Sequence, residues 1–152
     1  MMKTKKWTFQ TVLILFSFIC CKDAVAQDLK NHRWENRVLI IKTFDGTDAQ
    51  FLAQLAEIKG ENKEMMERKF TVYTILGNVF TRIDYKKSKN VFSTDKVSGQ
   101  LARILDKDEL FEVILIGLDG GIKLQQTKVL TKKELFEKVD SMPMRRSELK
   151  KN

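Results

Sequence analysis

The chain has 152 residues, of which 43% are hydrophobic and 32% charged, and its formal net charge at pH 7 is +8. These values are ordinary for one soluble globular domain. No base-reading motif accompanies the positive charge, and much of that charge lies near the N-terminus, so binding of nucleic acid is not expected.

The N-terminus has the three parts of a secretory signal peptide. Three lysines precede an apolar stretch at residues 12–19, and the small residues at 24–26 supply a cleavage pattern before Gln27. We therefore expect residues 1–26 to be a signal peptide. Residues 27–152 are then expected to form a single exported domain, periplasmic or secreted.

Two alternatives to cleavage remain open. The N-terminus could be retained as an anchor, or the protein could be lipid-anchored through Cys20 or Cys21. The apolar stretch is well short of the ~20 residues that a membrane span needs. No later segment approaches that length, so we expect no membrane span after signal cleavage.

Cleavage would also change the chemistry that the chain can perform. Four lysines and one aspartate leave with residues 1–26, which lowers the net charge from +8 to +5. Both cysteines of the sequence, Cys20 and Cys21, leave as well. A mature chain without cysteine presents no thiolate, so thiol–disulfide chemistry is not expected.

The first half of the expected domain reads as strand, helix, strand. Residues 38–41 are a continuous apolar run, typical of a central strand that is covered on both faces. Thr47 and Gln50 match a capping box, and an apolar helical face follows with Phe51, Leu52, Leu55 and Ile58. Gly60 interrupts that helical pattern, and Met65 and Met66 resume it as expected core residues. Residues 70–76 then read as a strand that runs parallel to the first.

The segment from residue 77 to 99 is the least regular part of the chain. Lys86, Lys87 and Lys89 make it basic, and serine, asparagine and aspartate interrupt it. We interpret it as a solvated loop with one short strand near residues 79–83, rather than as a binding patch.

The second half contains the strongest local signals. A short helix is expected at residues 101–105 with Ser98 as its cap, followed by a continuous apolar run at 113–116 that is typical of a doubly covered strand. Asp119-Gly120 predicts a tight turn into a returning strand at 122–127. Thr131 and Glu134 match a second capping box, which opens a helix with an apolar face. Pro143 is expected to end that helix, and the tail from Ser147 onward is expected to fray.

This order predicts an α/β fold of the thioredoxin-like kind. The expected architecture is a three-layer sandwich with a mixed four-stranded sheet of order 2-1-3-4 and helices on both faces. Two features of thioredoxins are missing from the sequence. No Cys-x-x-Cys follows the first strand, where Asp45-Gly-Thr-Asp48 stands instead, and no proline precedes Phe111.

Several motifs resemble the family called domain of unknown function 4174, over nearly the whole chain after residue 26. They are Trp34-Glu-Asn-Arg37-Val-Leu-Ile-Ile41, Gln54, Glu67-Arg68, Ile116-Gly-Leu-Asp-Gly-Gly-Ile-Lys123 and Asp140-Ser-Met-Pro-Met-Arg-Arg-Ser-Glu148. The resemblance implies a thioredoxin-like or peroxiredoxin-like fold. It also implies occurrence in exported bacterial proteins and, as repeated copies, in animal extracellular sushi-repeat and matrix proteins, without an established activity. The basic segment at 78–97 matches none of these motifs.

The same motifs predict a cluster of charged residues at one end of the sheet. Arg37 enters the first strand there, Arg68 leads into the second, and the last helix ends near Arg145 and Arg146. We expect these arginines to gather around Asp119, with Asp140 and Glu148 nearby. An arginine–carboxylate lock between the hairpin and the last helix is favoured over an anion-binding or partner-binding site.

Other chemistry is not expected from this sequence. His32 is the only histidine, and it is expected to be a surface residue without a catalytic partner. One histidine and no mature cysteine exclude the usual zinc and copper sites, and the acidic residues do not fit the spacing of a calcium loop. No metal or cofactor is therefore expected, and no catalytic residue is assigned.

Two functional hypotheses follow. In the first, the protein is a non-catalytic binding or structural module of the cell envelope or extracellular space, whose partner is a protein or an envelope component. In the second, it is an envelope or oxidative-stress enzyme whose reaction does not use cysteine. The missing thiolate and the single histidine favour the first hypothesis.

Overall fold

The structure, a computed structural model, describes residues 29–85, 91–97 and 99–150. The expected signal peptide and both cysteines lie outside the described residues, as do Lys86, Lys87, Lys89 and the expected helix cap Ser98. None of the helices in the described ranges is both long enough and apolar enough to cross a membrane.

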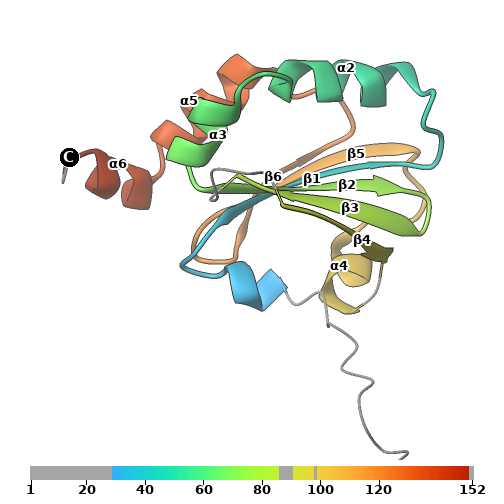
Figure 1. Ribbon diagram of the computed structural model, residues 1–152, viewed down its shortest axis with the longest axis horizontal. Helices are drawn as coiled ribbons and strands as arrows, with labels where there is room; N and C mark the ends of the chain where they lie inside the picture. The colour runs from blue at the N-terminus through green and yellow to red at the C-terminus, as the bar shows by residue number, and fades with distance from the viewer. Residues whose placement is uncertain (1–28, 86–90, 98, 151–152) are drawn as a thin grey trace, which may run out of the picture.

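Six strands form one mixed sheet in the order β4-β3-β2-β1-β5-β6 (Figure 1). Neighbours β1 and β2 are parallel, and all other neighbours are antiparallel. The strands are β1 (Arg37–Thr43), β2 (Phe70–Leu76), β3 (Val79–Asp84), β4 (Val91–Lys96), β5 (Phe111–Ile116) and β6 (Ile122–Gln126). The four expected strands lie consecutively as β2-β1-β5-β6, but the expected four-stranded sheet of order 2-1-3-4 is corrected to six strands.

The two additional strands form a hairpin at the edge next to β2. β3 pairs with β4 in the register Val79↔Lys96 to Asp84↔Val91, where the sequence suggested a loop with one short strand. Apart from Phe80, the described side chains of β3 are exposed or half-buried. Because a hairpin at a sheet edge needs little apolar burial, its polar composition resembled that of a loop.

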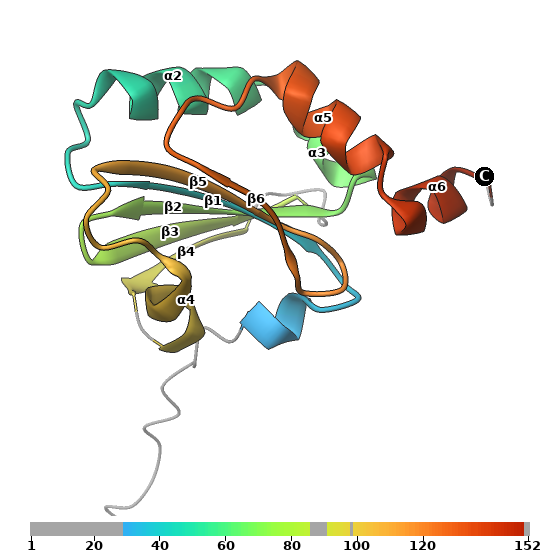
Figure 2. The ribbon, with the colours of Figure 1, turned by 180° about the vertical axis from the view of Figure 1, so that it is seen from behind.

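Helices cover both faces of the sheet, which confirms the α/β class. One face carries α2 (Ala49–Ile58), α3 (Asn62–Glu67) and α5 (Lys132–Asp140), with α6 (Pro143–Leu149) beside them. The 3₁₀ helix η2 (Leu29–His32) and α4 (Gly99–Ile104) lie on the opposite face (Figure 2).

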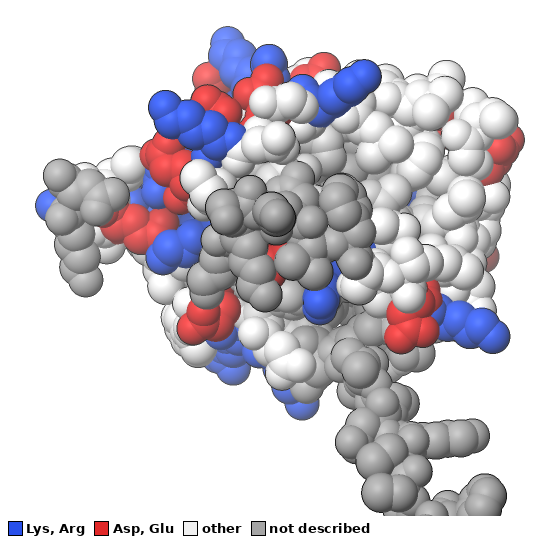
Figure 3. All heavy atoms as spheres, viewed as in Figure 1, with Lys and Arg blue, Asp and Glu red and all other residues white. Residues whose placement is uncertain are grey.

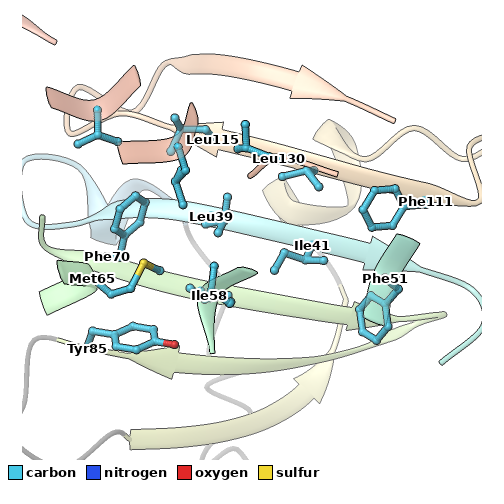
Figure 4. Packing of buried hydrophobic residues seen from close by; sticks show 14 residues of the cluster. Leu39, Ile41, Phe51, Ile58, Met65, Phe70, Tyr85, Phe111, Leu115 and Leu130 are labelled. Carbon is cyan, nitrogen blue, oxygen red and sulfur yellow. The ribbon is translucent and has the colours of Figure 1, made fainter. Parts of the chain in front are cut away.

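The central strands β1 and β5 are buried along their whole length, as the continuous apolar runs predicted. Their side chains alternate between two cores, one on each face of the sheet. The larger core joins both strands to the helices of the α2 face, and Figure 4 shows Leu39, Ile41, Phe51, Met65 and Leu115 among its members. Burying each such side chain contributes about 1.5–3 kcal/mol, so these cores are the main source of stability.

The two expected capping boxes had different outcomes. Thr131 and Glu134 form the predicted box at the start of α5, with both side-chain-to-backbone hydrogen bonds present. The box expected at Thr47 and Gln50 is wrong, because α2 begins one residue later with Asp48 as its cap. The Asp48 side chain accepts a hydrogen bond from the Phe51 amide at 2.8 Å, and the Thr47 hydroxyl donates to Asp45 instead.

One member of the expected apolar face of α2 points away from the core. Leu52 is 51% exposed, whereas the polar Gln54 is fully buried. Gln54 donates to the Leu130 carbonyl at 3.0 Å and accepts from the Leu130 amide at 2.7 Å. The Gln54 side chain therefore satisfies both backbone groups of Leu130, as a neighbouring strand would, and links α2 to the segment before α5.

The C-terminal segment is more ordered than the sequence suggested. Helix α5 ends at Asp140, and Pro143 is the first residue of a further helix, α6, that continues to Leu149. Proline is well tolerated at this first position, because its missing N–H would have no partner inside the helix. The expectation of a frayed tail from Ser147 onward is corrected up to Leu149.

Candidate functional site

Three of the five predicted site residues lie together where the start of β1 meets α3, α5 and α6. Arg37, Arg68 and Arg145 each form an ion pair with a carboxylate of a neighbouring helix. Figure 3 shows basic and acidic side chains interleaved over these helices. We call the group the arginine cluster, and it consists of Arg37, Glu67, Arg68, Lys69, Asp140, Arg145 and Glu148.

Arg37 is the most deeply buried member of the arginine cluster, with 0% of its surface exposed. Its Nη1 donates to the Arg68 carbonyl at 2.9 Å, and both terminal nitrogens lie 3.3 Å from one oxygen of Glu148. Its Nε has no hydrogen-bond partner. Burial lowers the pKa of Arg37, and the charge of Glu148 opposes this effect. Glu148 thus compensates a cation that has no access to water.

Arg145 connects three carboxylates and is only 3% exposed. It bonds Glu67 at 2.5 Å, Asp140 at 3.3 Å and Glu148 at 3.5 Å, and it also donates to the Glu67 carbonyl. Burial tends to lower the pKa of Arg145, but the hydrogen bonds and charges of Glu67 and Asp140 raise it overall. These four hydrogen bonds occupy most of the five N–H donors of the guanidinium.

Arg68 binds Asp140 with both oxygens of the carboxylate. Its Nε donates to one oxygen at 3.0 Å and its Nη2 donates to the other at 2.7 Å, a bidentate geometry. The guanidinium carbon also lies 4.5 Å from the centre of the Phe136 ring. Arg68 therefore fixes the end of α5 against the end of α3.

Local helix geometry places these groups on one side of α6. Arg145 and Glu148 are three residues apart, so both side chains point to the same face of the helix. Asp140 is the last residue of α5, and the start of α6 at Pro143 brings Arg145 back toward it. Arg37, the first residue of β1, pairs with Phe70 in the sheet register and shares a face with Leu39.

Two carboxylates of the arginine cluster, Asp140 and Glu148, have lowered pKa values. Burial would raise the pKa of Asp140, but the hydrogen bonds and charges of Arg68 and Arg145 lower it. Burial would also raise the pKa of Glu148, but the hydrogen bonds and charges of Lys69 and Arg37 lower it. An acid–base catalyst at neutral pH needs a pKa close to that pH, and these shifts run in the opposite direction. The geometry suits a structural lock.

The remaining two predicted residues do not join the arginine cluster. The Asp119 carboxylate forms an ion pair with Lys123 at 2.6 Å and accepts a hydrogen bond from the Gly121 amide at 3.1 Å. Arg146 is exposed and forms no ion pair within the described part of the chain. The expected gathering of arginines around Asp119 is therefore corrected: Asp140 and Glu148 take that role, together with Glu67.

The opposite end of the sheet, where β1 ends, holds two buried charged residues on neighbouring strands, Lys42 and Glu112. Lys42 donates to the carbonyls of Asp106 and Glu109, the latter at 2.6 Å. Glu112 accepts hydrogen bonds from the Asp106 amide at 3.1 Å and from Gln125 at 2.6 Å. These bonds are all internal and hold the segment between α4 and β5 against the sheet.

His32 is buried, with 8% of its surface exposed, so its expected surface position is wrong. Asn36 donates to its Nδ1 at 3.2 Å, which leaves the proton of the neutral ring on Nε2 for the bond to the Tyr73 hydroxyl at 2.7 Å. Burial lowers the pKa of His32, and the charge of Arg82 lowers it further. Sequence reasoning missed this contact because the surrounding segment is polar, while η2 turns the histidine inward.

Sequence patterns indicated only some of the other residues of the site. Asp140 and Glu148 were expected nearby, and Glu67 stood beside Arg68 in a quoted motif, but Lys69 was not singled out. Arg33 and Arg103 had no distinguishing pattern, although both line a hollow beside the Asp119 turn. Among the residues that the structure describes, no group of three or more histidine, cysteine or acidic side chains could hold a metal ion.

Comparison with known proteins identifies a family for this chain. The sequence model of the family described as "Domain of unknown function (DUF4174)" matches residues 28–148. This range includes every member of the arginine cluster and all twelve of the described helices and strands except the last residue of α6. No solved structure matches the chain.

Proposed function

We propose that this chain, which belongs to the family described as "Domain of unknown function (DUF4174)", is an exported, thioredoxin-like protein without redox cysteines. Its role would be that of a non-catalytic binding or structural module in the cell envelope or extracellular space. The observation that carries the proposal is the arginine cluster, in which each arginine is ion-paired with a carboxylate of the same chain. Charged side chains that are paired with one another inside the protein contribute to its structure rather than to binding a ligand.

The proposed thioredoxin-like core rests on the central four strands. Strands β2, β1, β5 and β6 are consecutive, with one parallel pair and two antiparallel pairs, and helices lie on both faces. At the end of β1, where thioredoxins place their cysteines, the chain has Asp45-Gly-Thr-Asp48. Removal of residues 1–26 would leave no thiolate anywhere in the protein, so this scaffold would act without thiol chemistry.

The proposal is tested on protein recovered from the cell envelope and from the medium. Intact mass should correspond to a chain that begins at Gln27, with neither Met1 nor a lipid on Cys20 or Cys21. The same protein should show no turnover in insulin-reduction and peroxide assays in which a thioredoxin or a peroxiredoxin is active. Turnover above the protein-free rate would overturn the non-catalytic function, and a retained N-terminus would overturn the proposed export of a cleaved chain.

A further inference from the structure

A hollow of about 400 Å³ lies on the face of the sheet opposite the arginine cluster. Its walls are η2, α4 and the β5–β6 turn, which Figure 2 shows next to one another below the sheet. The volume falls within the ~300–1,000 Å³ typical of small-molecule sites. Much of the lining is aliphatic and comes from all three walls: Leu29, Ile104, Ile116 and Ile122.

Two arginines on this hollow lack the internal carboxylates that occupy the arginine cluster. Arg33 and Arg103 both line it, both are exposed, and neither forms an ion pair within the described residues. Lys30 adds a third cation to the lining. Among the described residues, the carboxylate at the wall is that of Asp119, which is already bound to Lys123 at 2.6 Å. The hydrogen bond from Lys123 lowers the pKa of Asp119, so that charge is fixed and compensated.

The walls of the hollow are held in place from two sides. The Trp34 amide donates to the Leu118 carbonyl at 2.6 Å, which ties the segment after η2 to the β5–β6 turn. His32 ties η2 itself to the sheet through Tyr73. At Gly120, where φ is +79°, an added Cβ would lie 3.6 Å from the aliphatic carbons of Arg33. The arginine stem thus lies along the turn, and the site needs little rearrangement to accept a ligand.

We propose that this hollow binds a small organic anion with an aliphatic body, such as a medium-chain carboxylate. The aliphatic side chains would cover the body of the ligand, and Arg33 and Arg103 would pair with its charged group. A bare inorganic anion would leave the aliphatic lining exposed to water, and a neutral alcohol would leave both guanidinium groups without an anionic partner. This inference rests on the proposed binding function and specifies the class of ligand.

Titration of the purified protein with octanoate tests this proposal, with octanol and inorganic phosphate as separate arms. Binding is followed by the NMR shifts of the Arg33, Gly120 and Gly121 amides and by the fluorescence of Trp34, whose ring lies 5.2 Å from the Arg33 guanidinium carbon. We expect saturable octanoate binding, with shifts confined to the walls of the hollow. Octanol and phosphate should each bind at least about fivefold more weakly, because each lacks one half of the recognised chemistry.

The variants Arg33→Gln and Arg103→Gln should each weaken octanoate binding by about fivefold. The matched control is Arg146→Gln, which removes the same charge from an exposed position on α6 and should leave the affinity unchanged. Thermal unfolding of all three variants establishes that each is folded. Absence of saturable binding, equal binding of octanol, or an equal loss in Arg146→Gln would overturn the anion site. Each of these results is independent of the mass and turnover assays, which test the proposed function itself.

Discussion

Two regions of this protein carry arginines, and they differ in where the opposing charge comes from. In the arginine cluster, each guanidinium lies within 3.3 Å of a carboxylate from another element of the same chain. Beside the Asp119 turn, Arg33 and Arg103 line a hollow without an ion pair among the described residues. Arginine therefore stabilises the fold in one region and offers a cation to a ligand in the other.

The difference shows that burial and pairing, rather than residue type, decide what an arginine does. A buried guanidinium must keep its carboxylate, because leaving either charge alone in a dry environment is costly. An exposed guanidinium is already hydrated and exchanges water for a ligand at small cost. Substitutions in the two regions should consequently affect different properties, stability in one and ligand affinity in the other.

The largest effect is expected for Arg37→Ala. The substitution removes a fully buried cation, leaves the Arg68 carbonyl without this donor, and takes from Glu148 one of its three basic neighbours. We expect the free energy of unfolding to fall by about 3 kcal/mol. Urea denaturation measures it, and a loss below about 1 kcal/mol would mean that the cluster is not a structural lock.

The adjacent residues Arg145 and Arg146 offer a matched comparison on one helix. Arg145→Ala should lower the free energy of unfolding by about 2 kcal/mol, since it removes contacts to Glu67, Asp140 and Glu148. Arg146→Ala should change stability by less than about 0.5 kcal/mol, because this side chain is exposed and unpaired in the described structure. Both substitutions introduce alanine into the same helix, so helix propensity contributes equally. Equal losses would contradict the distinction.

Acid should weaken the arginine cluster. The pKa values of Asp140 and Glu148 lie below their ordinary values of 3.8 and 4.5 in the folded state. The unfolded chain therefore binds protons first as the pH falls, and the stabilisation present above about pH 5 is lost through the folded-state pKa values. Urea denaturation from pH 7 to pH 3 should show wild type and Arg145→Ala converging in stability. A constant difference in stability over this pH range would contradict a contribution from the ionised carboxylates of Asp140 and Glu148.

The smallest effect on stability is expected in the hollow. Arg33→Gln and Arg103→Gln should each change the free energy of unfolding by less than about 0.5 kcal/mol, because neither side chain is buried or ion-paired within the described residues. Thermal and urea unfolding without ligand measure this change. A loss as large as that of Arg145→Ala would place these arginines in the fold rather than in a ligand site.

Much of the fold could be predicted from short sequence patterns, because those patterns report local requirements. The apolar runs at β1 and β5 identified strands covered on both faces, and Thr131 with Glu134 identified the start of α5. The hairpin β3–β4 was missed as a pair of strands because an edge needs few apolar residues. Sequence spacing also could not choose between neighbouring caps, so Asp48 was passed over for Thr47.

The candidate site was harder to predict because its contacts are long-range. The arginines could be placed at one end of the sheet from topology, but topology does not say which carboxylate a flexible guanidinium will meet. Asp119 was expected to pair with these arginines, but its carboxylate pairs instead with Lys123, four residues further along the chain. His32 illustrates the same difficulty, since its partner Tyr73 lies 41 residues away.

The pair formed by Arg37 and Glu148 also affects the order in which the protein can be made. These residues are separated by 111 positions, so a growing chain carries Arg37 long before its carboxylate exists. Until Glu148 has been synthesised, closing α3 and α5 over the start of β1 would bury a cation without this partner. The final native packing is thus deferred to the end of translation. A chain cut short before Glu148 would lack this partner of Arg37 and should be less stable than the full domain.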